Sequence, residues 1–398
     1  MINYLMYLKI FFLTPIILLL FTIRIFKKFY INRIRSKKIG DMTTPIEIYI
    51  CEKKDDPKKI PVIYCMGANV ANEFLKKKWS KELIILPRQI LEPIYILFKK
   101  YKFFNIFFKD YSKEPIEVAR NHREFNYIDN RNVLSKYKPS IKFNYIEKNE
   151  GENYLKKIGL QNEKFVTFSS RTAEFHNEKG QSLRNSNIQN QITGVNFLVS
   201  KGYKAIRMGK NEKNKINFND SNVIDYATSV DQNDFLDVYL ASKCEFMISA
   251  ESGINELATI FRKPRLIVDH WSLSAFERYN SDVIILPKKF KNINTGNFVS
   301  FKEAYNRIEE RNNKKQPNLE NSFDLNKLGY EAIENNEFEI KKAVESMFNW
   351  MEKSYSFNEI LKIQKKFFQS VVTKNGYKEN SKVIICPNFY LSNIDLFE

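Results

Sequence analysis

The residues best suited to chemistry in this chain are arginines that follow short apolar runs in the segment from Phe165 to His270. Arg171 follows the run FVTFSS, Arg184 lies in the next polar stretch, and Arg207 ends the run KAIR. A guanidinium group presents a fork of N–H donors that matches two phosphate oxygens at once. The three side chains are therefore candidates for holding a diphosphate, and the alternative is that they are solvated loop arginines.

The segment ISAESGINELATIFRKP predicts a strand that turns at Ser252 and Gly253 directly into a helix. Free backbone N–H groups and the positive end of a helix dipole at such a turn favour a phosphate, and Gly253 permits close approach. Glu251 would repel a diphosphate, so we expect it to face a sugar or ribose hydroxyl. The alternative is an ordinary strand–turn–helix connection.

Other polar or small residues are expected at the same edge. The loop around Tyr226 and Ser229 could contact a base or ribose, or only cap the next helix, for which Asp234 is the expected N-cap residue. The full predicted ligand-binding set is Arg171, Arg184, Arg207, Met208, Gly209, Tyr226, Ser229, Glu251, Ser252, Gly253 and Asn255.

These positions need a scaffold, and the segment predicts one. FVTFSSR, KGYKAIRMG, NVIDYATS, CEFMISAESG and RKPRLIVDH are strand candidates, several of them separated by amphipathic helices, as in a Rossmann-like βαβ domain. Open sheets of this class bind ligands beyond the carboxyl ends of their strands. No Gly-x-Gly-x-x-Gly run follows a strand, which argues against a dinucleotide cofactor. There is also no Walker A motif and no metal-ligand spacing of Cys or His.

The net charge of +18 suits anionic partners, although a Lys- and Asn-rich composition explains it equally well. The basic residues are scattered and form no stripe of the kind that binds nucleic acid. Most of the four cysteines sit in or beside apolar runs, which predicts buried thiols in a reducing compartment and no disulfides.

The first residues predict a membrane anchor over 1–26, followed by a basic juxtamembrane linker over 27–45. The uncharged run Ile10 to Ile23 is shorter than the ~20 residues that span a bilayer, so whether the helix spans or lies in the membrane stays open. By the positive-inside rule the basic flank places the main body in the cytoplasm, at the inner membrane and near anionic lipid. The alternative is a buried or interfacial helix.

The rest of the chain predicts three parts. An N-terminal Rossmann-like domain covers 46–150, with IEIYIC and IPVIYCMG as strands. A C-terminal Rossmann-like, donor-binding domain covers 151–295, and a C-terminal helical segment over 296–398 packs back on the domains.

The run from KFVTFSSR through GYKAIRMG and IDYATS to SAESGINELATIFRKP closely resembles a family of uncharacterised bacterial glycosyltransferases, often found with genes for surface-polysaccharide synthesis. The resemblance is strongest from Phe165 to Pro264. It implies a GT-B-like α/β fold, in which two Rossmann-like domains face a cleft, here preceded by an N-terminal hydrophobic helix.

A more distant likeness is to heptosyltransferases, whose Ser-Gly helix start seats the donor diphosphate; Ser252 and Gly253 match it. FVTFSSR also looks like the His-x-Arg motif of some fucosyltransferases. Arg171 matches that motif, but Ser169 replaces the histidine and Thr172 the charged residue, so a fucose donor is not indicated.

The resemblance implies transfer of a sugar from a nucleotide-sugar donor to a glycan or lipid-linked acceptor, without a metal and without a resident cofactor. An inverting reaction needs a base, and His122 and Glu124 in NHREF are the only compact candidates. Two other classes stay open: a catalytically inactive GT-B-like module that binds nucleotide sugars or glycans as a membrane scaffold, and a basic peripheral membrane protein that binds lipid or nucleic acid through charge.

Overall fold

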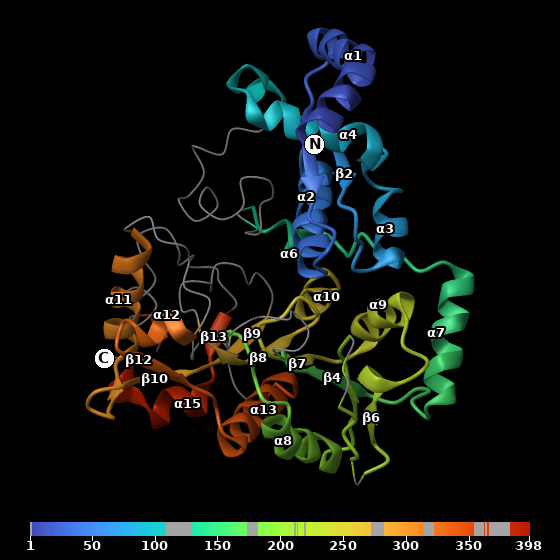
Figure 1. Ribbon diagram of the computed structural model, residues 1–398. Coiled ribbons are helices and arrows are strands. Elements are labelled where there is room, and N and C mark those ends of the chain that lie inside the picture. Colours follow the sequence, from blue (N-terminus) through green and yellow to red (C-terminus); the bar gives the residue numbers. More distant parts are fainter. Residues whose placement is uncertain are drawn as a thin grey trace. The chain divides into compact units, whose positions relative to one another are not determined.

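The computed structural model in Figure 1 describes residues 2–108, 129, 131–172, 182–210, 212, 214–218, 220–271, 282–313, 322–353, 362, 364–365 and 383–398. The chain forms two compact units, Met1–Ile141 and Lys142–Glu398. Both combine helices with a parallel sheet, which confirms the predicted α/β class. The predicted cleft between two domains stays a prediction.

Unit 1 is built on a three-stranded parallel sheet with the strand order β1-β2-β3. Its strands are β1 (Tyr30–Ile34), β2 (Val62–Met66) and β3 (Ile84–Ile85). Its helices are α1 (Ile2–Phe26), η1 (Gly40–Met42), α2 (Thr44–Asp55), α3 (Glu73–Trp79), α4 (Arg88–Lys100), η2 (Lys102–Phe107) and α6 (Val133–Lys136).

Two predictions for unit 1 are wrong. The expected linker over 27–45 contains β1, which pairs with β2, so the domain begins well before residue 46. The expected strand IEIYIC lies inside helix α2, which starts with Pro45 in its first turn. Unit 1 covers α2 on several sides, so the helix has apolar residues at alternate positions, as a strand would. The spacing of apolar residues therefore predicts a strand where the chain forms a helix.

Helix α1 packs along one side on α4 and η2. Leu20 is buried, and Leu13, Ile16, Ile17 and Phe21 are partly buried in a cluster that also contains Phe98 and Phe107. Part of the aromatic run after residue 90 is therefore core, including Tyr95, Phe98 and Phe107, whereas Phe103 and Ile106 are exposed. Of the helices in the described part of the chain, none combines the length and the apolarity that crossing a membrane requires.

Unit 2 contains a seven-stranded, wholly parallel sheet with the order β13-β9-β8-β7-β4-β5-β6. The strands are β4 (Phe165–Ser169), β5 (Lys204–Arg207), β6 (Val223–Asp225), β7 (Met247–Ser249), β8 (Arg265–His270), β9 (Val283–Pro287) and β13 (Val383–Ile385). Strands β8 and β9 are buried at every position. Such continuous apolar runs are typical of a parallel sheet covered on both faces.

The other elements of unit 2 connect or flank these strands (Figure 1). The helices are α7 (Tyr145–Lys157), α8 (Gln189–Ser200), η4 (Tyr226–Thr228), α9 (Asp234–Lys243), α10 (Asn255–Ile260), α11 (Phe301–Asn313), α12 (Ser322–Asn326), α13 (Glu337–Met351), α15 (Pro387–Ser392) and η6 (Ile394–Leu396). A small antiparallel sheet has the order β11-β10-β12, with β10 (Lys289–Asn292), β11 (Phe298–Val299) and β12 (Tyr330–Ile333).

The segment 296–398 is neither separate nor purely helical, which corrects the prediction. Strand β13 extends the main sheet beside β9, and α13 packs on α8. The segment thus completes the unit that begins at Lys142. The unit boundary after Ile141 also falls before α7, whereas the predicted boundary between residues 150 and 151 lies inside this helix.

The contact between α8 and α13 depends on Gly194. A Cβ atom built on Gly194 would lie 2.8 Å from Val344 Cγ2 and 3.5 Å from the Cα of Lys341. The missing side chain therefore lets the two helices approach closely, and α8 carries residues of the site described below.

We expect Gly194→Ala to lower the free energy of unfolding of unit 2 by about 1–3 kcal/mol, because the new methyl group overpacks the helix contact. Helix propensity alone predicts that the same substitution raises the free energy of unfolding, by up to about 1 kcal/mol. Chemical denaturation decides between them, with Asn196→Ala on the exposed side of α8 as the control. Addition of Val344→Ala should restore part of the loss, and a stabilised Gly194→Ala protein would contradict the packing argument.

Candidate functional site

The order of the main sheet reverses between β4 and β7. From β4 the chain adds β5 and β6 on one side, and from β7 it adds β8, β9 and β13 on the other. The connections that follow β4 and β7 therefore diverge at the carboxyl edge and leave room for a ligand. Arg171 follows β4, and Glu251, Ser252 and Gly253 follow β7, so the two motifs singled out in the sequence meet at this reversal point.

Buried polar atoms without partners gather at the same edge. Ser169 and Ser249 are opposite each other in the β4–β7 register, both side chains are fully buried, and neither hydroxyl has a hydrogen-bond partner in the described part of the chain. The side-chain oxygen of Asn255, which is 1% exposed at the start of α10, has none either. Buried polar atoms are normally paired, so this edge is suited to receive a polar group.

The chain between β4 and α8, which we call the arginine loop, carries two of the predicted arginines, Arg171 and Arg184. Arg171 is 6% exposed, and its Nη1 donates to Asn185 Oδ1 over 3.3 Å. Lys288, which follows β9, donates to the carbonyl oxygen of Asn185 over 2.7 Å. Arg184 is half-buried in the same loop, and its Nε has no hydrogen-bond partner among the described residues. Arg171, Arg184 and Lys288 bring three cations to this edge, and Lys288 also pairs with Glu334 at 3.7 Å.

The carboxylate of Glu251 lies beside a buried histidine. Its Oε2 lies 3.4 Å from Nδ1 of His270, the last residue of β8, which is completely buried. The hydroxyl of the neighbouring half-buried Ser252 has no partner within the described residues. Helix α10 has only six residues and begins at Asn255, so its dipole is weak. Ser252 and Gly253 would therefore act through their own N–H and O–H groups.

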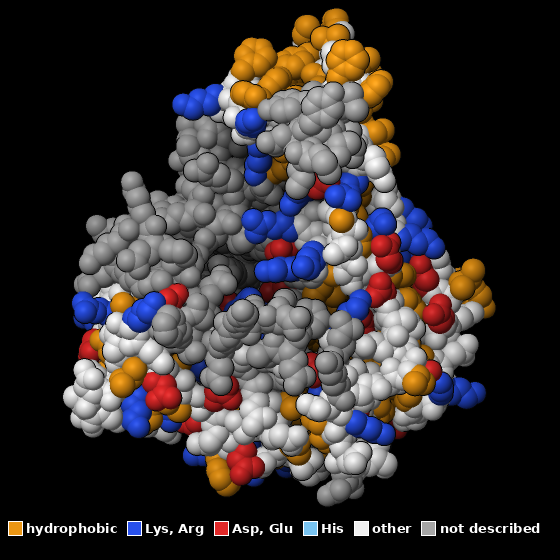
Figure 2. Space-filling model, viewed as in Figure 1, with side chains coloured by type: hydrophobic (Ala, Val, Ile, Leu, Met, Phe, Trp, Pro, Cys, Tyr) orange, Lys and Arg blue, Asp and Glu red, His pale blue; other side chains and the backbone are white. Residues whose placement is uncertain are grey.

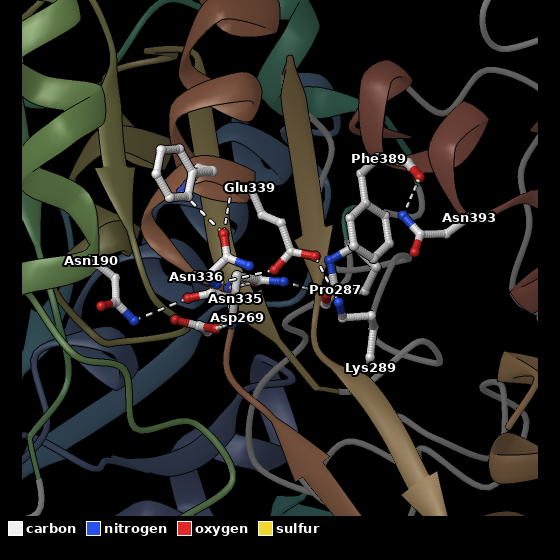
Figure 3. Close-up of polar contacts among 10 residues, drawn as sticks. Asn190, Asp269, Pro287, Lys289, Asn335, Asn336, Glu339, Phe389 and Asn393 are labelled. Atoms are coloured by element: carbon white, nitrogen blue, oxygen red, sulfur yellow. Dashed lines mark hydrogen bonds and ion pairs between the residues drawn. The ribbon is translucent and has the colours of Figure 1, made fainter. Parts of the chain in front are cut away.

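Asp269 and Asn335 join three segments behind the site. The Asp269 backbone N–H donates to Asn335 Oδ1 over 3.0 Å, and the Asn335 N–H donates to Asp269 Oδ1 over 2.6 Å. The Asn335 side chain also donates to the Pro287 carbonyl, and Asn190 of α8 donates to the carbonyl of Asn335 (Figure 3). Ser186 donates to the other Asp269 oxygen over 2.5 Å. This network fixes the arginine loop, α8 and the start of α13 to the edge of the sheet.

The backbone of Asp269 is in the left-handed region, with φ of 53°, at a register irregularity between β8 and β9. Aspartate tolerates this conformation better than most residues. Directly after Asn335, the residues Asn336 and Glu339 form the capping box of α13, and Glu339 pairs with Lys289 over 2.7 Å (Figure 3). Burial raises the pKa of Asp269 to about 6, against the opposing effects of Lys288 and Ser186.

Arg207 is a correction to the predicted site. It ends β5 at the expected edge but is 3% exposed, and it pairs with Asp225 and Glu212 at 3.1 Å each. Two carboxylates offset its charge, so we remove it from the diphosphate-binding set. Met208 is buried and continues the pairing with β4 through its N–H. A Cβ atom on Gly209 would lie 2.7 Å from Glu212 Cγ, so this glycine serves the ion pair.

Tyr226 and Ser229 also have structural roles. Tyr226 is completely buried, and its hydroxyl donates to Asp237 Oδ1 over 3.0 Å. Ser229 accepts a hydrogen bond from the N–H of Asp231. The N-cap of α9 is Asn233, whose side chain accepts from the Leu236 N–H, and not Asp234 as expected. These residues therefore organise the loop after β6 and are not placed as ligands.

The predicted base candidates His122 and Glu124 lie outside the described residues. Sequence reasoning missed Asp269, His270 and Lys288; the Asp-His ending of RLIVDH was a signal that polar residues close that strand. Among the described residues, no group of three or more His, Cys, Asp or Glu side chains is arranged to hold a metal ion. Metal independence stays a prediction.

The chain matches no family model and no curated protein. Its fold is similar to that of E. coli ADP-heptose LPS heptosyltransferase II, at 14% identity and a TM-score of 0.42, over 65% of this chain and 90% of that one. A family 9 glycosyl transferase from Veillonella parvula matches at 11% identity and TM-score 0.42, over 65% and 86%. S. aureus MnaA in a structure with UDP matches at 17% identity and a TM-score of 0.34, over 60% of this chain and 79% of that one. Heptosyltransferases, to which the sequence shows a distant likeness, are thus among the structures that the chain matches.

We expect the stability conferred by Asp269 to depend on pH. Its folded-state pKa is about 6 against an ordinary 3.8, so the folded protein binds the extra proton and its stability falls as pH rises from about 4 to 6. Relative to Asp269→Asn, the wild type should lose about 3 kcal/mol of unfolding free energy over this window. Urea titrations at several pH values measure the difference. It should be flat above pH 7, and a flat difference throughout would contradict the shift.

We expect Arg207→Met to destabilise unit 2 by about 3–5 kcal/mol, because it leaves the buried Asp225 carboxylate without its cation. Arg207→Met combined with Asp225→Asn should cost less than the sum of the two single changes. Arg207→Lys keeps the charge and the fold, and it should keep any nucleotide-induced rise in melting temperature. Loss of that rise in a folded Arg207→Lys protein would return Arg207 to the binding site.

Proposed function

We propose that this protein is a glycosyltransferase whose unit 2 binds a nucleotide-sugar donor at the carboxyl edge of β4 and β7. The observation that carries the proposal is the arrangement at the strand-order reversal. There Arg171, Ser252 and Gly253 lie beside three buried oxygen atoms, of Ser169, Ser249 and Asn255, that have no partner among the described residues. A guanidinium fork, hydroxyls and a glycine N–H are the groups that a diphosphate needs.

The proposed reaction breaks the bond between the donor sugar and its diphosphate and joins the sugar to an acceptor hydroxyl. The leaving diphosphate gains negative charge, which Arg171 and Arg184 would offset without a metal. Glu251, beside His270, is suited to accept hydrogen bonds from donor hydroxyls. The acceptor proton would go to a base, for which His122 and Glu124 remain the candidates that the sequence offers.

We further propose that the acceptor is a surface-polysaccharide precursor or a glycolipid at the cytoplasmic face of the inner membrane. This part of the proposal comes from the family that the sequence resembles and from the basic residues after α1. The membrane positions the enzyme near a lipid-linked acceptor, which raises the effective concentration of that acceptor.

We expect one of UDP, GDP, ADP or CMP to raise the melting temperature selectively. At a hundred times the dissociation constant the gain is about 2.7 kcal/mol, or roughly 5–10 °C for a unit of this size. Arg171→Ala removes a charge-assisted contact and should weaken binding by about 10- to 100-fold. Ser252→Trp should abolish it, since the indole fills the phosphate position.

Arg307→Ala, at an exposed arginine of α11, is the matched control and should bind as the wild type does. If no nucleotide stabilises the folded protein, the assigned site is wrong. Selective binding without donor hydrolysis or transfer would instead identify an inactive module that binds nucleotide sugars.

A further inference from the structure

The outer face of α1 is apolar and exposed. Phe11, Phe12, Leu18, Leu19 and Phe26 are 72%, 71%, 62%, 55% and 85% exposed. These residues lie on the side of the helix opposite the packed stripe, because they are adjacent in the sequence or seven or eight residues apart, which is about two helical turns. Thr22, a polar residue on this face, returns its hydroxyl to the Leu18 carbonyl over 3.0 Å. The face therefore offers almost no group that water would solvate.

Helix η2 and the end of α4 extend this apolar face. Phe103 is 72% exposed and stacks on Phe21 of α1, with ring centroids 6.0 Å apart. Ile106 is 48% exposed, and its carbonyl accepts a hydrogen bond from Arg24 of α1. Figure 2 shows hydrophobic side chains gathered over this end of unit 1. We call the surface formed by Phe11, Phe12, Leu18, Leu19, Phe26, Phe103 and Ile106 the apolar platform.

The charge around the platform has one sign. Residues 11–40 and 93–108 contain no Asp or Glu. Lys27 and Lys28 are exposed directly after α1, and Lys99, Lys100 and Lys102 are exposed directly before Phe103. An apolar surface whose described flanking segments carry only cations is complementary to the acyl chains and the anionic headgroups of a lipid bilayer.

The inner stripe of α1 limits how the helix meets that bilayer. Leu20 and Phe21 belong to the same cluster as Phe29 and Ile31 of the region around β1 and Cys65 of β2. A bilayer-spanning α1 would either leave this cluster or carry the charged residues of α4, such as Glu92 and Lys99, into hydrocarbon. Both are costly. A helix that lies in the plane of the interface keeps its packed stripe and buries only its outer face.

We infer that the apolar platform docks unit 1 onto an anionic lipid bilayer as an in-plane, monotopic surface, with α1 parallel to the membrane. The inference goes beyond the proposed function and does not depend on it, because every contact that carries it lies within unit 1.

The first test is co-sedimentation of the full chain with vesicles of phosphatidylcholine containing 30% phosphatidylglycerol. Wild-type protein should bind these vesicles at least tenfold more tightly than pure phosphatidylcholine vesicles, and less tightly as salt screens the lysines. Leu18→Glu with Leu19→Glu should lower the partition coefficient at least tenfold. Phe338→Glu, which changes a 66% exposed side chain of unit 2, is the matched control and should leave it unchanged.

The second test measures the orientation of the helix. Nitroxide labels on Phe12→Cys and Phe26→Cys stand fourteen residues apart, about 21 Å along a helix. The four native cysteines are buried, so labelling is selective. An in-plane helix places both labels at the same depth, within about 5 Å. Depths that differ by about 20 Å would show a spanning helix and overturn the inference.

Two further outcomes would also overturn it. Vesicle binding by the Leu18→Glu, Leu19→Glu protein equal to that of the wild type would show that the platform is not the docking surface. A wild-type protein that ignores vesicles and forms a dimer that these substitutions dissociate would assign the platform to a second copy of the chain. The assay contains no nucleotide, so its failure leaves the donor site untouched, and a normal nucleotide response confirms that each variant is folded.

Discussion

The reversal of strand order between β4 and β7 is the constraint on which the rest of unit 2 depends. A parallel strand can be followed by its neighbour only through a crossover that returns to the opposite end of the sheet. Successive crossovers run to one side of β4 and later ones to the other side of β7, so the connections that leave these two strands diverge at their carboxyl ends. The loops after both strands then face one place, and side chains far apart in the chain become neighbours.

Burial decides which of these neighbours are available to a ligand. Arg207 and Arg171 look equivalent in the sequence, because each follows an apolar run. The structure gives Arg207 two carboxylate partners and packs Gly209 against one of them. A buried guanidinium between two carboxylates contributes to the fold and has little charge left for a phosphate. The same reasoning separates Tyr226, which is enclosed, from Ser252, which lies at the edge.

The polar groups behind the site form hydrogen bonds that hold the segments around it in place. Asp269 accepts hydrogen bonds from a backbone N–H and a serine hydroxyl, and its own N–H is satisfied by Asn335. The Asn335 side chain also donates to the Pro287 carbonyl, and the Asn335 backbone carbonyl accepts from Asn190 of α8. This one residue therefore links two strands and helix α8 at the start of α13. In unit 1, by contrast, the exposed groups on the outer face of α1 are apolar. In the described structure no protein segment covers this face, so its burial in an apolar environment would be favourable.

The sequence by itself determined the class of the fold, most strands of unit 2 and the helix α1, because parallel strands and a nonpolar helix leave strong local patterns. It also placed Arg171 and Ser252 at strand ends, since an apolar run that stops at a polar residue marks a carboxyl edge. It misread α2, where packing on several sides removes the difference between strand and helix periods. It also misread the region 27–45, where basic residues surround and interrupt the short strand β1. Only the tertiary structure decided that Arg207 is paired, that Asp269, His270 and Lys288 lie at the site, and that the C-terminal segment completes the sheet. Those facts depend on contacts between residues many positions apart, and no local pattern records which distant carboxylate a buried arginine will meet.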